Sequence, residues 1–533
     1  MRKYISIILF LLLALYAFEL SSASRFGTYA PVIAVERLQN RLCFSWSKPS
    51  YPAYYEVEVF SGSREHWQLL PSDATRITRY RTLSNNIQLD NSFPESAFIR
   101  VSAHSLLHHP LGTYSEPVAF SSLRQANLKP APTLHYPASA PAPSTAMLSW
   151  SPVAGAVYYE FELLSALPEN PNGTEHSRFQ LLVTRDVFSN GHSLDISRFF
   201  RDKVYWRARG LDFNGNPIGV FSDAEEIYID NLQPFLLRPL SNTGYAAANL
   251  PVPIYPVYEW IPIPGATQYE VELTDHPPEN PNGTYPSEHR IWTSIVQSRY
   301  DCYDENPRIS PGTYYWRVRG LDENGHAVGV YSDAEAYTVD FQSGRYAATF
   351  GDSITHGGGA VSYSPADMEY SFQKYLSFPA LNLGKSGDTS ETMLYRFEHD
   401  VLPFHPQFLL IMGGTNSLRG GVPAEEVIHD LATIRDKCIR NGIRPIFLTL
   451  PPINPDAIAR VFQEETSPEW KEQFALVNAF LRQQRYVIDI APFFMNADGD
   501  LPPHFAVDGL HMDLEGKKLM GQLINANWSR VTR

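Results

Sequence analysis

Residues 346–355 read Tyr-Ala-Ala-Thr-Phe-Gly-Asp-Ser-Ile-Thr, a short apolar run that gives way at Gly351 to a polar turn. Further short apolar runs follow at residues 381–383, 408–412, 445–450 and 487–490. Segments with helical periodicity lie between these runs, and the clearest spans residues 424–440. Strands that alternate with helices predict a parallel sheet covered by helices on both faces. In such a sheet the functional site forms at the carboxyl ends of the strands.

A serine and a possible base lie at such ends. Ser353 follows the first apolar run directly. A serine at a strand-to-helix turn presents its hydroxyl at the top of the sheet, where backbone N–H groups can face an oxyanion. Asp508 and His511 lie three residues apart, ahead of a helix predicted to begin near Leu514. The carboxylate can hold Nδ1–H and leave Nε2 facing the serine, although a surface histidine beside an unrelated aspartate is the alternative.

Two more candidates belong to the same layer of strand ends. Gly387 follows the second predicted strand and could offer its N–H, and Asn416 follows the third and could offer its side-chain amide. Together with the Ser353 N–H they would supply three donors for a tetrahedral oxyanion. Taken singly, each would be an ordinary turn or cap residue. His356 precedes three glycines, and we expect it on a rim loop where it touches substrate.

The four segments, in their order and at strand ends, resemble the four blocks of the SGNH (GDSL-type) hydrolase family. These blocks are Gly-Asp-Ser, a glycine, Gly-x-Asn and Asp-x-x-His, and the resemblance covers residues 342–533. It implies a flavodoxin-like three-layer α/β fold and hydrolysis of ester or thioester bonds, with no cofactor and no metal. Ser417 follows Asn416 where family members often carry another residue, a departure that affects the surroundings of the donor and not the donor itself.

Carried over residue by residue, the resemblance assigns a role to each candidate. Ser353 would be the nucleophile, His511 the base and Asp508 the residue that orients the base. Ser353, Gly387 and Asn416 would form the oxyanion hole. The sequence shows no His, Cys and carboxylate cluster with zinc-like spacing, so no metal-binding residues are predicted.

The chain upstream of this region repeats itself. The segment Pro-Glu-Asn-Pro-Asn-Gly-Thr occurs at residues 168–174 and again at 278–284, an offset of 110. The same offset relates the segments that begin Trp-Arg at residues 206–212 and 316–322. A constant offset over a whole unit indicates duplicated domains. A third, diverged copy lies upstream, because Trp46 and Tyr55 are nine residues apart, as are Trp150/Tyr159 and Trp260/Tyr269.

Each of these tyrosines opens a segment in which apolar and charged residues alternate, such as Tyr-Glu-Val-Glu-Leu at residues 269–273. Period two predicts a strand with one buried face and one solvent face. Units of about 100 residues with several such strands are typical of antiparallel β-sandwiches. With their early Trp and late Tyr-Ser or Phe-Ser turns, the units resemble fibronectin type III domains. We place them at residues 29–121, 130–231 and 232–341, followed by the hydrolase domain at 342–533.

Two features of these repeats allow a second interpretation. The repeated tryptophans could bind sugars, but we expect them to fill the sandwich cores. The Asn-Gly-Thr segments at Asn172 and Asn282 fit glycosylation sites, but Pro-Asn-Gly is also a turn signal, and we favour the turn.

The N-terminus predicts export. Arg2 and Lys3 precede an apolar run at residues 5–20, and small residues up to Ala23 suit cleavage there. Residues 1–23 are therefore predicted to be a signal peptide, with an uncleaved anchor as the alternative. The protein would be secreted, periplasmic or displayed at the cell surface, with no stable membrane span after cleavage. Three widely spaced cysteines, Cys43, Cys302 and Cys438, argue against a disulfide framework.

Composition narrows the class of function. The 533 residues carry a formal charge of −14 and no long Lys/Arg run, which disfavours nucleic acid as a partner. We therefore expect an exported serine esterase that removes small acyl groups, acetyl above all, from a carbohydrate, with the sandwiches as spacers or targeting modules. The alternatives are a lysophospholipase or thioesterase acting on lipid esters, acyl transfer to a sugar, and a surface adhesion or scaffold protein with a vestigial hydrolase domain.

Overall fold

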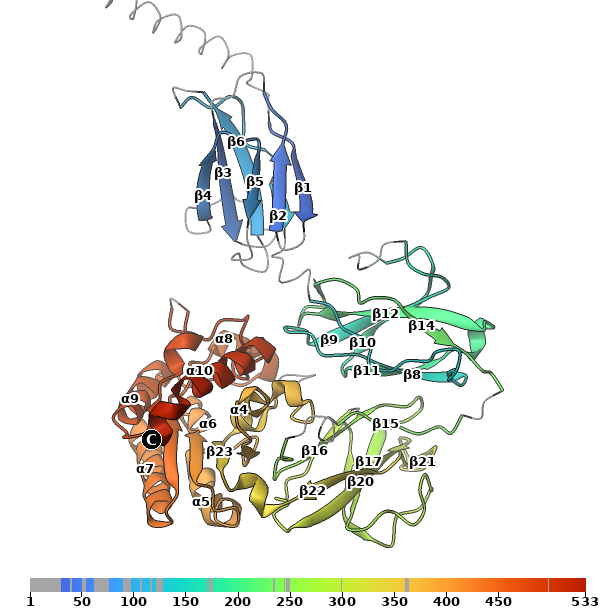
Figure 1. Cartoon of the computed structure of the whole chain (residues 1–533), viewed down its shortest axis with the longest axis vertical. Coiled ribbons are helices and arrows are strands. Elements are labelled where there is room, and N and C mark those ends of the chain that lie inside the picture. Colours follow the sequence, from blue (N-terminus) through green and yellow to red (C-terminus); the bar gives the residue numbers. More distant parts are fainter. Residues whose placement is uncertain are drawn as a thin grey trace, which may run out of the picture. The chain divides into compact units, whose positions relative to one another are not determined.

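The chain forms two compact units, Met1–Leu128 and Lys129–Arg533. The computed structural model describes residues 30–533 apart from residues 39–40, 50–53, 62–75, 90–96, 106–107, 116, 121–127, 170–171, 173–175, 233–234, 244, 246–249, 299, 360–363 and 497. The predicted signal peptide lies outside the described residues. The first unit holds one β-sheet domain, and the second holds two further β-sheet domains and a C-terminal α/β domain (Figure 1).

The C-terminal domain is built on one parallel five-stranded sheet. Its strands are β23 (Ala347–Gly351), β24 (Leu381–Asn382), β25 (Phe408–Met412), β26 (Arg444–Leu448) and β27 (Val487–Ile488). The order β24-β23-β25-β26-β27, with every neighbouring pair parallel, is 2-1-3-4-5 in chain order, as in flavodoxin-like folds. The parallel sheet predicted from the five apolar runs is confirmed.

Helices cover both faces of this sheet. The longer ones are α5 (Ser390–Asp400), α7 (Ala424–Arg440), α9 (Trp470–Arg482) and α10 (Leu514–Thr532). Connections between parallel strands are right-handed, so α5, α7 and α9 lie on one face of the sheet. Helix α7 packs against both α5 and α9 there. The first crossover runs in the opposite direction along the sheet, so its short helices η4 (Met368–Tyr370) and η5 (Phe372–Tyr375) lie on the other face together with α10.

Helix α7 has the bounds that its periodicity predicts. Its buried residues recur at helical spacing and are Ala424, Val427, Leu431, Ile434 and Cys438. Cys438 is fully buried among them, so it packs in the core as expected. Among the described residues all three cysteines are free.

Each of the other domains consists of two antiparallel sheets. In the first unit these contain β1 (Ile33–Leu38), β2 (Arg41–Trp46) and β5 (Asn86–Leu89), facing β4 (Arg76–Thr82), β3 (Tyr54–Ser61), β6 (Ala97–His104) and β7 (Val118–Phe120). The second domain contains β8 (Thr145–Ser149) and β11 (Gly191–Asp195), facing β10 (Gln180–Val187), β9 (Tyr158–Leu164), β12 (Lys203–Leu211), β13 (Pro217–Ile218) and β14 (Glu225–Tyr228). The third contains β15 (Leu240–Ser241), β16 (Val257–Ile261) and β19 (Asp301–Tyr303), facing β18 (Arg290–Val296), β17 (Gln268–Thr274), β20 (Gly312–Leu321), β21 (Ala327–Val328) and β22 (Glu335–Val339). The antiparallel β-sheet regions are confirmed, and their fibronectin type III character stays a prediction.

The repeated tryptophans lie in the cores between the sheets. Trp46, Trp150 and Trp260 are at most 3% exposed, so they cannot stack on a sugar at the surface. Each packs against the tyrosine nine residues later, with ring centroids 5.4, 5.5 and 5.1 Å apart. The repeated Trp and Tyr pair is therefore one structural contact that occurs three times.

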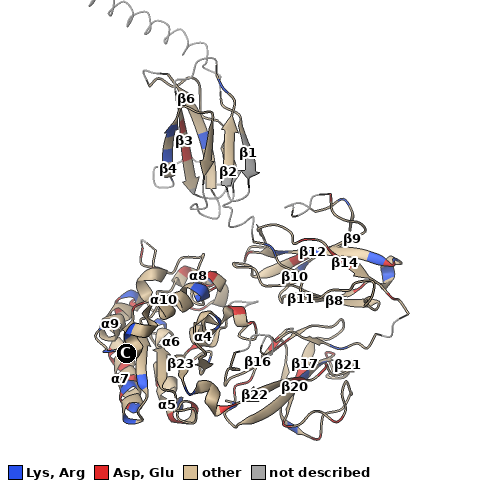
Figure 2. Ribbon diagram, in the orientation of Figure 1, with Lys and Arg blue, Asp and Glu red and all other residues tan. Residues whose placement is uncertain are grey.

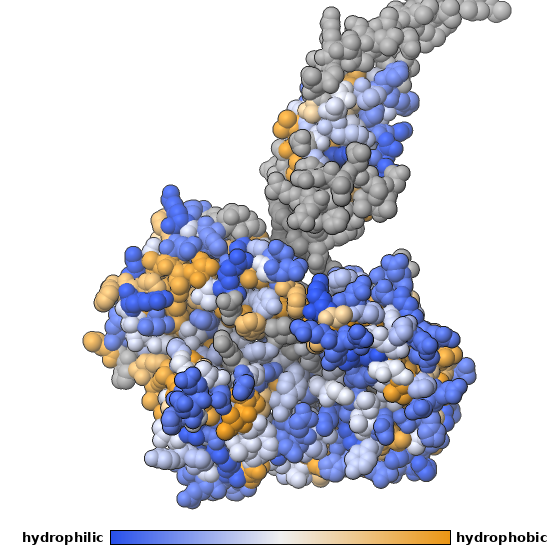
Figure 3. Space-filling view, turned by 180° about the vertical axis from the view of Figure 1, so that it is seen from behind, coloured by the Kyte–Doolittle hydropathy of each residue, from blue (hydrophilic) through white to orange (hydrophobic). Residues whose placement is uncertain are grey.

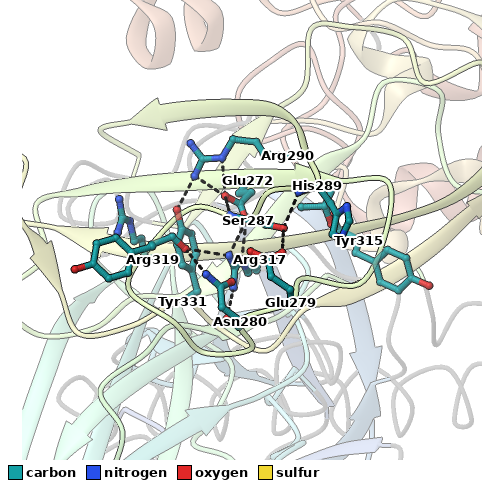
Figure 4. A network of polar contacts seen from close by, with 12 residues as sticks. Glu272, Glu279, Asn280, Ser287, His289, Arg290, Tyr315, Arg317, Arg319 and Tyr331 are labelled. Carbon is teal, nitrogen blue, oxygen red and sulfur yellow. Dashed lines mark hydrogen bonds and ion pairs between the residues drawn. The ribbon is translucent and has the colours of Figure 1, made fainter.

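The expected solvent face of the tyrosine-opened strands is absent, because the alternating glutamates are buried. In β17 the carboxylate of Glu272 accepts hydrogen bonds from Arg317 at 2.8 Å and Arg290 at 2.6 Å (Figure 4). Glu270 likewise pairs with Arg319 at 2.6 Å. Acidic residues of β3 lie between basic residues of its neighbouring strands in the same way (Figure 2). Paired charge on adjacent strands makes this burial tolerable.

The second copy of the Pro-Glu-Asn-Pro-Asn-Gly-Thr segment, at residues 278–284, covers these charges in the third domain. In the third domain the carbonyl of Asn280 accepts a hydrogen bond from Arg317 at 2.8 Å, and the ring of Tyr331 lies 4.1 Å from the same guanidinium (Figure 4). The Asn282 amide donates to the carbonyl of Tyr331 at 3.1 Å and holds the loop in place. Asn282 has a φ of 50°, which suits the predicted turn. The half-buried Asn282 amide is thus engaged in hydrogen bonds to Tyr331 and Asp333 of the same domain.

Both sandwiches of the second unit contact the C-terminal domain. In the second sandwich the N–H of Gly155 donates to the carboxylate of Asp513 at 2.5 Å. In the third, Ile254 and Tyr255 belong to the same hydrophobic cluster as the C-terminal core. The Ile254 N–H also donates to the carbonyl of Asn382, at the end of β24, at 3.1 Å. The sandwiches are therefore packed onto the α/β domain as well as joined to it by the chain.

The surface drawn in Figure 3 is mainly hydrophilic, with hydrophobic residues in scattered patches. Within the part of the chain that the structure describes, none of the helices combines the length and the hydrophobicity needed to span a bilayer.

Candidate active site

The turn that carries Ser353 is shaped by the residues on either side of it. Gly351 ends β23 so close to β25 that a Cβ there would lie 2.0 Å from the carbonyl oxygen of Met412. Asp352 then caps the short helix α4 (Ser353–His356), accepting a hydrogen bond from the N–H of Ile354 at 3.0 Å. Ser353 is the first residue of this helix, so its own N–H has no partner within the helix. The turn therefore presents a hydroxyl and an N–H that has no hydrogen-bond acceptor in the described part of the chain.

Ser353, His511 and Asp508 form one hydrogen-bonded chain. The Ser353 hydroxyl donates to Nε2 of His511 at 2.8 Å, and Nδ1–H of His511 donates to Asp508 at 2.8 Å. Asp508 has no proton to give when ionised, so it fixes this tautomer of the imidazole. Its other oxygen accepts the N–H groups of Leu510 and His511, each at 2.8 Å.

The groups around Asp508 stabilise its ionised form. Burial of this fully enclosed carboxyl raises its pKa, but the His511 imidazole and the backbone N–H groups outweigh burial and leave the pKa below its ordinary value. An ionised carboxylate beside Nδ1 stabilises the imidazolium that forms when Nε2 takes a proton. The arrangement can therefore draw a proton from Ser353.

Gly387 and Asn416 line the same pocket as Ser353. Gly387 has a φ of 84° in the turn after β24, and its N–H has no hydrogen-bond partner among the described residues. Asn416 lies in α6 (Thr415–Arg419), where its amide nitrogen donates to the carbonyl of Asp388 at 2.9 Å. Arg419 donates to the amide oxygen of Asn416 at 3.2 Å. These two bonds fix the amide and leave its second hydrogen available.

The residues surround one open pocket of about 270 Å³. Its lining residues are Tyr303, Ser353, Gly358, Gly359, Ser386, Gly387, Asn416, Arg419, Phe462, Glu464, Leu510 and His511. Phe462 meets His511 edge-on at 5.9 Å, and Arg419 pairs with Glu464 at 2.7 Å across the rim. The pocket is thus bordered by the residues that carry the possible oxyanion donors, Ser353, Gly387 and Asn416. The candidate base, His511, borders it as well.

A lysine lies beneath the serine turn. The ammonium of Lys517, fully buried on α10, donates to the carbonyl of Ile354 at 2.5 Å. Burial lowers the pKa of Lys517 to about 7 and raises that of Asp352 to about 6. Each of these buried groups lowers the cost of charging the other, so they brace the turn as a pair. The sequence indicates Lys517 only by placing a lysine on the inner face of the predicted C-terminal helix.

His356 does not lie on the rim, contrary to expectation. It is 1% exposed and ends the short helix α4. Its Nε2–H donates to the carbonyl of Tyr255 at 2.8 Å, and Ser386 donates to its Nδ1 at 2.9 Å. The third sandwich covers this histidine, which the sequence of the α/β domain could not reveal.

Sequence reasoning also missed most of the other lining residues, among them Arg419, Phe462 and Tyr303. Arg419 lies three residues after Asn416 on the same short helix, a spacing that brings side chains together, so it could have been found. Phe462 ends α8 (Pro455–Phe462), and its helical periodicity gives no hint of the pocket. Tyr303 comes from the third sandwich, so no pattern within residues 342–533 could have indicated it.

Comparisons with known proteins support the identity of the C-terminal domain. Residues 349–519 match the model of the GDSL-like Lipase/Acylhydrolase family. The domain is therefore a GDSL-like lipase/acylhydrolase (SGNH) domain, of a family of carboxylic ester hydrolases. The chain is also 33% identical over 115 residues to the uncharacterized lipoprotein YqeF of Bacillus subtilis (strain 168), spanning 20% of this chain and 47% of that protein. It thus spans about half the length of this relative.

Solved structures of hydrolases are similar to part of the chain. The lipase/acylhydrolase from Enterococcus faecalis is 24% identical, with 35% of this chain and 97% of that chain covered and a TM-score of 0.29. A catalytic mutant of an acetylxylan esterase from Geobacillus stearothermophilus is 18% identical, with 34% and 92% covered and a TM-score of 0.27.

Proposed function

We propose that this chain is an exported serine esterase that removes small acyl groups, acetyl above all, from a carbohydrate. The observation that carries the proposal is the hydrogen-bonded chain from Asp508 through His511 to Ser353, which ends in an open pocket. The signal-peptide pattern at residues 1–23 supports export, as does the name of the Bacillus subtilis relative, a lipoprotein.

The geometry supports a two-step acyl transfer. His511 takes the Ser353 proton as Oγ bonds to the ester carbonyl carbon, and the carbonyl oxygen becomes an oxyanion. As the C–O bond to the alcohol breaks, His511 returns the proton to the leaving alkoxide, and the acyl group remains on Ser353. Water then attacks the carbonyl carbon of this acyl ester while His511 accepts a proton from the water. His511 returns that proton to Oγ of Ser353 as the bond between Oγ and the acyl carbon breaks. The enzyme ends unchanged, with one acid and one alcohol released.

Three donors face the oxyanion in this scheme. They are the N–H of Ser353, the N–H of Gly387 and the side-chain amide of Asn416. The amide is already held by Arg419 and by the carbonyl of Asp388, so little reorganisation is needed when charge develops.

The lining of the pocket supports a small acyl group and a polar alcohol. A space of about 270 Å³ is at the lower end for a ligand pocket. Nine of its twelve lining residues are glycines or polar residues, and Tyr303, Phe462 and Leu510 carry its large apolar side chains. A long acyl chain would need a longer apolar surface than these three residues supply. Arg419 and Glu464 offer groups that can bond sugar hydroxyls.

Activity on p-nitrophenyl esters is expected to be highest for acetate and to fall as the acyl chain lengthens. Each added methylene has little further apolar wall to contact, so it gains only a small part of the roughly 0.8 kcal/mol that full burial of a methylene provides. The measurement is kcat/KM for the acetate, butyrate, octanoate and palmitate esters, with acetate release from an O-acetylated polysaccharide in parallel. A maximum at octanoate or longer would favour the lipid acyl hydrolase instead.

Asn416→Ala is expected to lower kcat by roughly 10²–10³, the usual effect of removing one side-chain oxyanion donor. KM should change little, because the donor acts on the charge that develops in the transition state and not on the ground state. Steady-state kinetics with p-nitrophenyl acetate measure both quantities. The matched control is Asn478→Ala, a buried asparagine that bonds the backbone of Leu450 away from the pocket. If the Asn416 variant loses no more kcat than this control, the amide is not an oxyanion donor.

A further inference from the structure

We propose that Tyr303, a residue of the third sandwich, binds the alcohol half of the substrate inside the esterase pocket and so makes this sandwich part of the active site. The inference rests on the proposed function of Ser353 and adds the residue that selects the alcohol. A hydroxyl-rich alcohol such as a sugar fits the chemistry of a phenol wall, whose ring packs on C–H groups while its O–H bonds a hydroxyl.

Tyr303 lies in the pocket with Ser353, although 50 residues and a domain boundary separate them. It ends β19 and pairs with Val257 of β16 in the third sandwich. A Cβ at Gly358, the pocket glycine near Ser353, would lie 3.0 Å from its hydroxyl oxygen. A side chain at this glycine would therefore crowd the phenol.

The sandwich is fixed to the catalytic domain next to this tyrosine. The Tyr255 hydroxyl donates to the buried carboxylate of Asp400 at 2.7 Å, and its carbonyl accepts the Nε2–H of His356 at 2.8 Å. The ring of Tyr303 in turn meets His356 edge-on at 5.9 Å. These contacts are buried and polar, so the position of Tyr303 relative to the serine turn is determined by specific bonds and not by the linker alone.

The hydroxyl of Tyr303 is available to a ligand. Within the described part of the chain it has no hydrogen-bond partner, whereas the buried hydroxyls of Tyr255 and Tyr245 both have one. Burial, with the negative charge of Asp301 next to it, raises the pKa of Tyr303 well above its ordinary value. The phenol therefore stays protonated at neutral pH and can donate a hydrogen bond as well as accept one.

The duplicated second sandwich shows which features are particular to the third. At the offset of 110 residues, Trp260 corresponds to Trp150, and both fill their cores. Tyr303 corresponds to Ser193, and Tyr255 corresponds to Thr145. The two copies thus share the residues that hold the fold and differ at the residues that face the catalytic domain. This difference is expected if the third copy has a role in the site that the second copy lacks.

The test uses the full chain with Tyr303→Phe and Tyr303→Ser, the second of which restores the residue of the duplicate. For 6-O-acetylglucose, which keeps its other hydroxyls free, we expect kcat/KM to fall roughly two- to tenfold in the Phe variant, the effect of one neutral hydrogen bond. The Ser variant also loses the ring, so we expect a fall of roughly 10- to 100-fold. For p-nitrophenyl acetate, which carries no sugar, the Phe variant should change by less than about twofold. Tyr315→Ser is the control, because Tyr315 lies on β20 of the same sandwich and is not one of the residues that line the pocket.

Labelling with an organophosphonate separates this inference from the proposed function. If the probe labels Ser353 equally in all variants and only turnover of the sugar ester falls, Tyr303 binds the alcohol as proposed. Unchanged kinetics on both esters, with Ser353 still labelled, would overturn the inference and leave the esterase intact. Slower labelling together with equal losses on both esters would make Tyr303 a structural support and would also overturn it. Failure to label Ser353 in the parent chain would instead refute the proposed function.

Discussion

Ser353→Ala is expected to lower kcat by roughly 10⁶ while leaving the fold unchanged. The substitution removes the oxygen that attacks the ester and that donates to His511 at 2.8 Å. A residual rate of roughly 10³–10⁴ over water should remain, because the oxyanion donors and the pocket are untouched. The measurements are kcat on p-nitrophenyl acetate and thermal unfolding of both proteins, and the unfolding temperatures should agree closely because only one small hydroxyl is lost.

Ser386→Ala is the informative control for this variant, because Ser386 also lines the pocket and also pairs with a histidine. That histidine, His356, is a poor base, since burial lowers its pKa to about 4 and its Nε2–H is committed to the carbonyl of Tyr255. The Ser386 variant should therefore keep most of its activity. Normal turnover in Ser353→Ala, or a phosphonate label on Ser386, would contradict the assignment of the nucleophile.

Much of the C-terminal fold follows from the sequence because its elements are buried in a regular way. Strands covered on both faces read as short apolar runs, so the strand at residues 408–412 was predicted with its observed bounds. The catalytic candidates could be grouped for a related reason. Parallel strands place their carboxyl ends at one edge, so residues such as Ser353 and Asn416, which follow different strands, must meet there.

The sequence was misleading where one part of the chain covers another. Alternating glutamates in β17 predict a solvent face, but Glu272 is buried because Arg317, 45 residues later, lies opposite it. His356 is likewise buried by the third sandwich and not exposed at the rim. Periodicity reports the faces of a single element and cannot report what a distant segment places on them.

The role expected for the sandwiches changes for the same reason. If the sandwiches were only spacers or targeting modules, the C-terminal domain would contain the complete site, since all four motif segments follow residue 350. In the structure the third sandwich supplies Tyr303 to the pocket and the Tyr255 contacts to Asp400 and His356. Only the first β-sheet domain lies in a separate compact unit.

Asp508→Asn is expected to lower kcat by roughly 10⁴, through the tautomer of His511 and not through the position of its ring. The asparagine can still accept the N–H groups of Leu510 and His511 with its amide oxygen, as Asp508 does at 2.8 Å. Its NH₂ group then faces Nδ1, where the carboxylate had accepted a hydrogen bond from Nδ1–H. Nδ1 must become an acceptor, so the single imidazole proton moves to Nε2. A protonated Nε2 donates towards Ser353 and can no longer remove its proton.

The control for this variant is Asp489→Asn, the same change at the end of β27. Asp489 bonds Thr449 at 2.8 Å and Arg482 at 2.9 Å and does not border the pocket, so we expect less than about a twofold change in kcat. Both variants are assayed on p-nitrophenyl acetate after their unfolding temperatures have been matched to the parent chain. If folded Asp508→Asn retains kcat within about tenfold, His511 needs no anionic partner, and the proton transfer described for this site would have to be reassigned. Both variants exchange one carboxylate for an amide. If Asp508→Asn loses the expected activity and Asp489→Asn does not, the loss is therefore caused by removing the buried carboxylate that binds Nδ1–H of His511.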